Sequence, residues 1–255
     1  MSDITAMYTS VSPINASSHG DVAIKPATNL EFSRGINSIP VVAAEFPSAA
    51  QDMAIVFTGD DDAMLPVALT GVKPNENAYL DGDGKWTGRY VPAFLRRYPF
   101  IFARSEPDTM TMCLDEGYSG VNRDGRGERL FDSDGNRTQY LENMLGFVTQ
   151  YQRQYIVTQA FCKRLEALDL LEAATLNATD ADGETRRLVG FQVIKRQKFK
   201  EIPDADLLTM FRSDELELCY LHMHSLQNLG IKLANVQAPE LTRELSDQDA
   251  AETLQ

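Results

Sequence analysis

The hydrophobic pattern in the first half of the chain is typical of short strands joined by turns. Apolar runs of strand length are bounded by proline, glycine, asparagine and aspartate. These runs cover residues 38–46, 53–59, 65–72, 77–84 and 109–118. Between the last two, RYVPAFLRRYPF predicts a short helix that Pro92 opens and Pro99 ends, because proline suits a first helical turn but not a helix interior.

A long amphipathic helix is the clearest element. Steps that alternate three and four residues reach mostly apolar positions, namely Leu141, Met144, Val148, Tyr151, Tyr155, Thr158, Cys162, Leu165 and Asp169. This period predicts a helix of about thirty residues with one buried stripe. Thr138 is the expected N-cap. Cys162 lies on the stripe, so we expect it to be buried and unreactive.

The C-terminal part combines one predicted strand with a helical pair. Residues 186–195 follow an Asp-Gly turn and indicate a strand, whereas residues 203–233 indicate two helices that begin near Asp204 and Asp214. Strands come first and helices later, without alternation. The sequence therefore predicts an α+β fold with a strand-rich N-terminal half, a long amphipathic helix and a C-terminal helical pair.

The chain is long enough for one large domain, which we expect over residues 1–238. Residues 239–255 hold five acidic residues, one arginine and no aromatic residue. We expect this acidic tail to be disordered.

Composition and charge limit the function classes. The chain is 43% hydrophobic and 24% charged, as in a soluble globular protein, and its net charge of −13 disfavours non-specific binding to nucleic acid or anionic lipid. Cys113, Cys162 and Cys219 are far apart and odd in number, which argues against a disulfide framework and for a reducing compartment. We find no signal-peptide pattern and no run of ~20 apolar residues, so we expect a cytoplasmic protein without a membrane span.

Three Asp-x-Asp-Gly segments occur at residues 81–84, 132–135 and 180–183. In a calcium-binding loop of the EF-hand type the glycine comes two positions later than it does here. Because Asp-Gly pairs between apolar runs form turns, we expect ordinary turns at these segments.

Residues 120–137, GVNRDGRGERLFDSDGNR, concentrate glycine, arginine and acidic residues in one connection. The pattern fits neither a phosphate-binding P-loop nor a dinucleotide fingerprint, and Glu128 would repel a pyrophosphate. One interpretation is a solvated loop with local arginine–carboxylate pairs. The other is a functional surface anchored by Arg123, Arg126 and Arg129, since so long a connection is uncommon without a role of its own.

A second candidate surface is the segment around Arg96 and Arg97. With aromatic walls, these arginines would form a clamp for a carboxylate or a phosphate. The aromatic residues nearby in sequence are Tyr90, Phe94, Tyr98 and Phe100. The alternative, which amphipathic packing favours, is a short core helix whose arginines pair with acidic residues of the same chain.

His222, Ser225 and Asn228 follow Cys219 at intervals of three residues on a predicted helix. A zinc site lacks a second ligand pair, and catalysis by Ser225 would need a base and an acid that converge on it. The three residues are the catalytic candidates if the chain is an enzyme. Helical spacing favours a polar ladder across a helix packing seam instead. No cofactor and no metal ion is predicted.

Residues 186–200 contain six basic residues and no acidic residue. Interleaved Phe191 and Phe199 would suit nucleic-acid binding. Such a run is more often the solvent face of a strand or the complement of an acidic patch in the same fold. We therefore expect no nucleic-acid partner.

Over about residues 5–233 the chain resembles the SapC family of bacterial proteins. The segments that carry the resemblance are FSRGINSIPVVAAEFP, YVPAFLRRYPF, NRDGRGERLFDSDG, TQAFCKRLEALDLL and DELELCYLHMHSLQN. The family name comes from an association with surface-layer proteins, and the resemblance provides no catalytic residues. Members are often encoded beside TonB-dependent outer-membrane transporters and halogenase-like flavoproteins, which implies an accessory role in uptake or in a modification pathway.

These observations predict an accessory protein that binds another protein or a peptide. The expected contact residues are Arg96, Arg97, Arg123, Arg126 and Arg129. An enzyme with a pocket near His222 and a structural surface-layer component are the alternatives.

Overall fold

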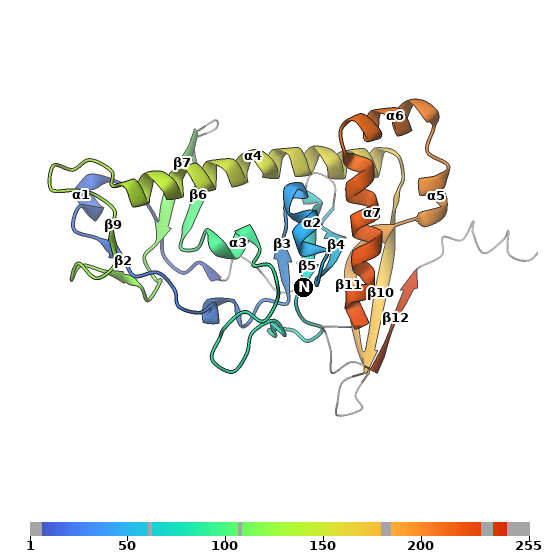
Figure 1. Cartoon of the computed structure of the whole chain (residues 1–255), viewed down its shortest axis with the longest axis horizontal. Helices are drawn as coiled ribbons and strands as arrows, with labels where there is room; N and C mark the ends of the chain where they lie inside the picture. Colours follow the sequence, from blue (N-terminus) through green and yellow to red (C-terminus); the bar gives the residue numbers. More distant parts are fainter. Residues whose placement is uncertain (1–6, 61–62, 107–108, 180–184, 231–236, 244–255) are drawn as a thin grey trace, which may run out of the picture.

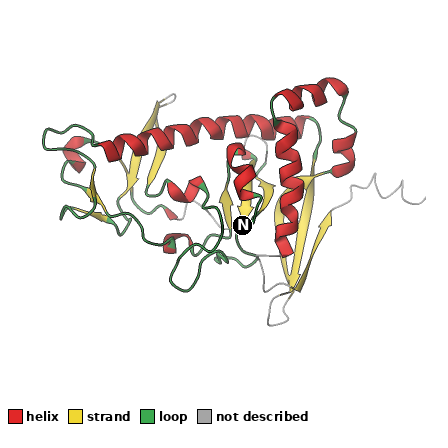
Figure 2. Ribbon diagram, viewed as in Figure 1, coloured by secondary structure: helices red, strands yellow, loops and turns green. Residues whose placement is uncertain are grey.

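The computed structural model of the chain describes residues 7–60, 63–106, 109–179, 185–230 and 237–243 (Figures 1 and 2). The described residues form three antiparallel sheets and several shorter helices, and one long helix, α4 (Gln139–Ala167), lies along one side of the molecule (Figure 1). The predicted α+β class, with a long helix and a C-terminal helical pair, is confirmed.

The largest sheet has the strand order β12-β10-β11-β4-β5-β3. Its strands are β3 (Ser38–Pro40), β4 (Ala54–Thr58), β5 (Leu65–Leu69), β10 (Leu171–Thr179), β11 (Thr185–Ile194) and β12 (Gln237–Arg243). The seam between β11 and β4 is narrow, because the two strands pair at a single position, Gln192 with Phe57. Thr58 extends the seam, since its hydroxyl donates to the carbonyl of Gly190 over 3.2 Å.

Two smaller sheets lie at the other end of the molecule (Figure 1). One has the order β1-β7-β6 and the other the order β8-β2-β9. Their strands are β1 (Val11–Pro13), β2 (Ala23–Ile24), β6 (Phe100–Glu106), β7 (Thr109–Asp115), β8 (Val121–Asn122) and β9 (Glu128–Arg129). Short helical turns connect the strands: α1 (Ala16–His19), η2 (Glu31–Ser33), η3 (Ala43–Glu45), α2 (Phe46–Ala49) and α3 (Ala93–Arg96).

Helix α4 spans the molecule from the end with the two small sheets to the end with the largest sheet (Figure 1). It begins as predicted, because the Thr138 hydroxyl accepts the backbone N–H of Leu141. Its buried stripe belongs to three hydrophobic clusters: Leu141 and Val148 in the first, Tyr151 in the second, and the stretch around Cys162 in the third. Cys162 is buried as predicted, and burial raises the pKa of its thiol to about 12.

The C-terminal helices are α5 (Arg196–Lys200), α6 (Asp204–Arg212), α7 (Glu215–Ser225) and the 3₁₀ turn η5 (Leu226–Gly230). An ion pair of 2.7 Å between Arg164 and Glu215 joins the end of α4 to the start of α7. None of the helices in the described part of the chain has the length and hydropathy that crossing a membrane requires.

Two of the predicted strands differ from the structure. Within residues 38–46 the described strand is limited to Ser38–Pro40, because the Glu45 carboxylate accepts the N–H of Val42 and fixes a helical turn at Ala43–Glu45. Residues 77–84 form a turn instead of a strand, because the Asp81 carboxylate accepts the N–H groups of Asp83 and Lys85.

Near the C-terminus, the sequence pattern does not predict β10. The boundary that we expect at residue 238, between the domain and the acidic tail, lies inside β12. Residues 239–243 therefore belong to a strand that pairs with β10. Residues 244–255 lie outside the described residues.

Thr158 provides a test of how α4 is joined to the N-terminal half. Its hydroxyl accepts the buried N–H of Ala43 over 2.8 Å. The Thr158→Val substitution keeps the shape of the side chain but leaves that N–H unpaired, so we expect a loss of about 1–3 kcal/mol in the free energy of unfolding. Urea unfolding measures this loss. Thr149→Val is the control, because Thr149 is a half-buried residue of the same helix, and it should change stability little.

Candidate binding site

The connection at residues 120–137 is ordered by its own hydrogen bonds. The Asn122 carboxamide donates to the carbonyls of Ala23 and Arg126 and accepts the N–H groups of Asp124 and Arg126. Gly127 has φ +95°, and a Cβ there would lie 2.3 Å from the carbonyl oxygen of Ile24, so β9 needs glycine at this position to approach β2. The solvated-loop interpretation thus understates the order of this segment.

The described Asp-x-Asp-Gly segments are turns, as predicted. Asp132 accepts the N–H groups of Asp134 and Asn136, the same offsets at which Asp81 accepts from Asp83 and Lys85. Asn122 uses the same offsets, so a third turn of this kind lies in the arginine-rich loop. The segment at 180–183 lies outside the described residues. Among the residues described, no group of three His, Cys, Asp or Glu side chains could hold a metal ion.

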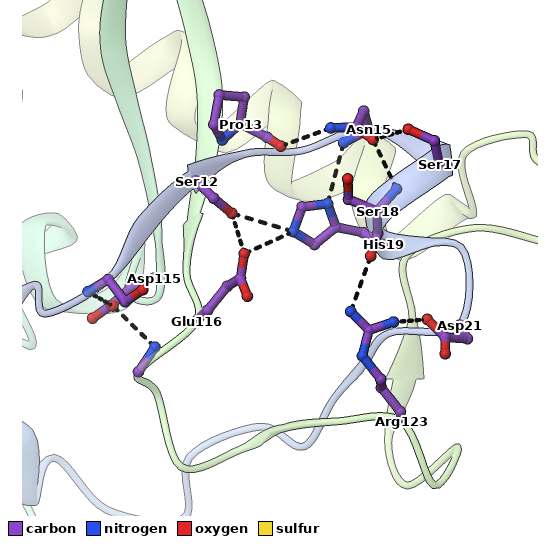
Figure 3. A network of polar contacts seen from close by, with 12 residues as sticks. Ser12, Pro13, Asn15, Ser17, Ser18, His19, Asp21, Asp115, Glu116 and Arg123 are labelled. Atoms are coloured by element: carbon purple, nitrogen blue, oxygen red, sulfur yellow. Dashed lines mark hydrogen bonds and ion pairs between the residues drawn. The ribbon is translucent and has the colours of Figure 1, made fainter.

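The three arginines of this loop have different surroundings. Arg123 pairs with Asp21 and donates to the carbonyl of Ser18 (Figure 3). Arg129 donates to the carbonyl of Gly20. Both arginines therefore hold the loop against residues 18–21. Arg126 pairs with Asp124, two residues away, and 69% of its side chain is exposed. All three arginines are exposed, but among the described residues Arg126 is the one whose side-chain contact stays within its own loop.

A cluster of Ser12, His19 and Glu116 lies beside Arg123 (Figure 3) and was not expected from the sequence. The Ser12 hydroxyl donates to Glu116, and the Nε2 atom of His19 lies 3.3 Å from that hydroxyl and 3.4 Å from the Glu116 carboxylate. The Nδ1 atom of His19 faces the N–H of Asn15. In a catalytic triad the acid and the serine contact opposite ring nitrogens. Here both contact Nε2, so the cluster cannot work as a triad.

A cleft of about 440 Å³ opens next to this cluster, between two loops that are far apart in the sequence. Its aromatic side is made by Phe32 and Tyr98, whose rings stack 4.3 Å apart, and by Tyr118. Lys25 and Glu31 bring opposite charges to it. Small residues and glycines supply much of the remaining lining: Pro26, Ala27, Thr28, Asn29, Gly117, Ser119 and Gly120.

Asp115 holds one wall of the cleft in place. Its buried carboxylate accepts the N–H groups of Thr9, Ser10 and Gly117 and the hydroxyl of Tyr98 over 3.0 Å. Burial acts to raise the pKa of Asp115, but the hydrogen bonds from Ser10, Thr9, Gly117 and Tyr98 outweigh it, and the pKa lies below its usual value. The cleft is therefore formed before any ligand binds.

Arg96 and Arg97 lie against aromatic rings, as the clamp hypothesis requires. Arg96 is exposed and donates to the hydroxyl of Tyr90, and its guanidinium lies over the rings of Tyr90 and Phe147. Arg97 is buried. Within the described part of the chain, neither arginine forms an ion pair with a carboxylate, contrary to the expectation that core packing would pair them with acidic residues.

His222, Ser225 and Asn228 are buried and hydrogen-bonded to backbone groups. The N–H of Ile194 donates to Nε2 of His222 over 3.1 Å, and Nδ1 lies 2.9 Å from the carbonyl of Ile55. Ser225 accepts the N–H of Ile55, and Asn228 donates to the carbonyl of Ala50. The predicted polar ladder is confirmed, and the bonds to Ile194 and Ile55 leave neither ring nitrogen of His222 open to a substrate.

The imidazole of His222 also completes a strand pair. Following the register of Gln192 with Phe57, the next antiparallel partners would be Ile194 and Ile55. The imidazole lies between the N–H of Ile194 and the carbonyl of Ile55 and bonds to both. A side chain from α7 thus replaces the backbone hydrogen bond that the narrow seam lacks.

Comparison with known proteins gives one family. The SapC family model matches residues 14–231 of the chain. No curated protein and no solved structure matches the chain.

The structural role of His222 can be tested by substitution. His222→Leu would leave two buried backbone groups unpaired, and we expect the free energy of unfolding to fall by about 2–4 kcal/mol. Chemical denaturation measures the effect. His224→Leu is the matched control, because His224 is exposed two residues away and its imidazole contacts the Gln227 side chain, not a buried backbone group. Equal stability of the two variants would contradict the bridging role.

Asp115 predicts a pH dependence. The carboxyl pKa is lower in the folded chain than in the unfolded chain, where it is ~3.9. The stabilisation is therefore present above about pH 4 and is lost as the pH falls through the folded pKa. We expect Asp115→Asn to be less stable by about 1.5–3 kcal/mol at pH 7.

The difference between Asp115→Asn and the unsubstituted chain should narrow below about pH 4. Urea unfolding across this pH range measures it. Asp134→Asn, at an exposed turn position, is the control and should show no such pH-dependent difference.

Proposed function

The chain belongs to the SapC family, and we propose that it is an accessory protein that binds an extended segment of a partner polypeptide in the cleft. The observation that carries the proposal is the lining of the cleft. Its volume of about 440 Å³ falls within the range of known binding pockets, ~300–1,000 Å³. The stacked rings of Phe32 and Tyr98 offer a surface for an apolar side chain.

The small residues of the lining favour a polypeptide over a small molecule. Ala27, Thr28 and Ser119 are exposed, and together with Gly117 they leave backbone groups accessible to an approaching chain. An extended peptide gains affinity from such main-chain hydrogen bonds and specificity from pockets for its side chains. None of the lining residues is a histidine or a cysteine. We therefore propose binding, not catalysis, as the role of the cleft.

Arg126 extends the proposed surface. Gly120 lines the cleft, and β8 begins at the next residue, so the arginine-rich loop starts where the cleft wall ends. An exposed arginine at such a rim suits an acidic residue of the partner. The family resemblance suggests two kinds of partner, a component of TonB-dependent uptake and a halogenase-like flavoprotein.

Site-specific photo-cross-linking tests the cleft. A photoreactive amino acid replaces Thr28 in the cleft, and in a second variant it replaces Gln197, which is exposed on α5. In the native host, we expect the Thr28 position to form an adduct with a defined polypeptide that Gln197 does not form. Mass spectrometry identifies the adduct.

Phe32→Ala in the Thr28 variant should reduce that adduct by ~10-fold, because an apolar contact surface is lost. The thermal stability of each variant is measured to exclude unfolding. Absence of an adduct at Thr28, or the same adducts at both positions, would contradict a partner in the cleft.

A further inference from the structure

Arg97 is a buried cation that has no counter-ion among the described residues. Only 8% of the residue surface is exposed, and the guanidinium carbon lies 4.4 Å from the ring centre of Phe94 and 4.7 Å from that of Tyr151. In the part of the chain that the structure describes, no carboxylate forms an ion pair with it. Ring contacts offset only part of the cost of removing a charge from water.

Two buried carboxylates in this half of the molecule accept hydrogen bonds from other donors. Glu45 accepts the N–H groups of Val42 and Ala93 and the hydroxyl of Tyr90. Asp115 accepts from the donors described above. Among the described residues, neither acid forms an ion pair with Arg97.

Two donors at this position lack acceptors. The Nε–H group of Arg97 and the O–H group of Tyr8 are both buried and have no acceptor among the described residues. Tyr8 packs in the same hydrophobic cluster as Phe94 and Tyr151, whose rings flank the guanidinium. Burial raises the pKa of Tyr8, while the charge of Arg97 and a hydrogen bond from Arg97 to the hydroxyl oxygen oppose that rise. Buried polar groups in proteins are nearly always hydrogen-bonded, so unpaired neighbours indicate a missing acceptor.

We propose that Arg97 and Tyr8 form a binding site for an oxyanion, a carboxylate or phosphate group of a ligand. The guanidinium fork matches the oxygens of either group with two parallel hydrogen bonds, and the tyrosine hydroxyl provides a third donor. The aromatic rings hold the guanidinium in a fixed orientation before the anion arrives. This site is distinct from the lining of the cleft, and its existence does not depend on a polypeptide partner.

Thermal unfolding with acetate and with inorganic phosphate tests the site, at a constant ionic strength maintained with sodium chloride. We expect at least one of the two anions to raise the Tm of the unsubstituted chain in a saturable manner, by about 4 °C. The two titrations distinguish a carboxylate site from a phosphate site. No saturable rise with either anion would overturn the proposal.

Substitutions assign the effect to Arg97. Arg97→Met should abolish the rise in Tm and should not lower the Tm without anion, because an unpaired buried charge is removed. Arg96→Met, at the exposed neighbour, should keep the full rise. If Arg97→Met responds to the anion as the unsubstituted chain does, the proposal is wrong.

Tyr8→Phe and Arg97→Lys keep the test valid if Arg97→Met does not fold. Tyr8→Phe should weaken the apparent anion affinity about fivefold by removing one hydrogen bond. Arg97→Lys keeps the charge but loses the fork, and we expect it to weaken affinity by at least as much. Unchanged affinity in both variants would overturn the site.

Discussion

The structure depends on the burial of one apolar stripe, that of helix α4. Three of the hydrophobic clusters contain residues of this helix, so each is completed by the same continuous element. The sheets at the two ends of the molecule share no strand. Their relative position follows from packing against a common helix, and the hydroxyl of Thr158 adds a buried hydrogen bond to the same contact.

A second constraint is that buried polar groups must be paired, and here side chains and backbone frequently satisfy each other. His222 bonds to two strands, whereas Glu45 and Asp115 accept backbone N–H groups. Carboxylates that are stabilised in this way need no cation as a partner. Such hydrogen bonds fix loops and strand ends, and they occupy Glu45 and Asp115, neither of which pairs with Arg97 among the described residues.

The elements that sequence predicted well are those defined by local chemistry. The period of α4, the cap at Thr138 and the turns at Asp81 and Asp132 arise from residues within a few positions of one another. The spacing of His222, Ser225 and Asn228 likewise indicated a polar ladder. What the pattern could not supply was the partner of each group, because Ile55 is 167 residues from His222.

The same limit applies to the candidate sites. Strands β8 and β9 have two residues each and pair with β2, so their own sequence has no strand period. The cleft combines residues 25–32 with residues 98 and 117–120, and no local signal joins them. The sequence shows Arg96 and Arg97 among aromatic residues. The fold is needed to show that Arg97 has no acidic partner among the described residues.

The small sheet β8-β2-β9 has a consequence for how the molecule is made. Its strand pairs join residues separated by 97 to 106 positions, from Ile24 with Val121 to Ala23 with Arg129. Contacts between distant parts of a chain form late, because a long loop must close before they stabilise anything. The surface around Arg126 and Gly120 therefore exists only once residues 20–24 and 120–129 have come together. A partner that recognises this surface will distinguish the folded chain from the unfolded chain.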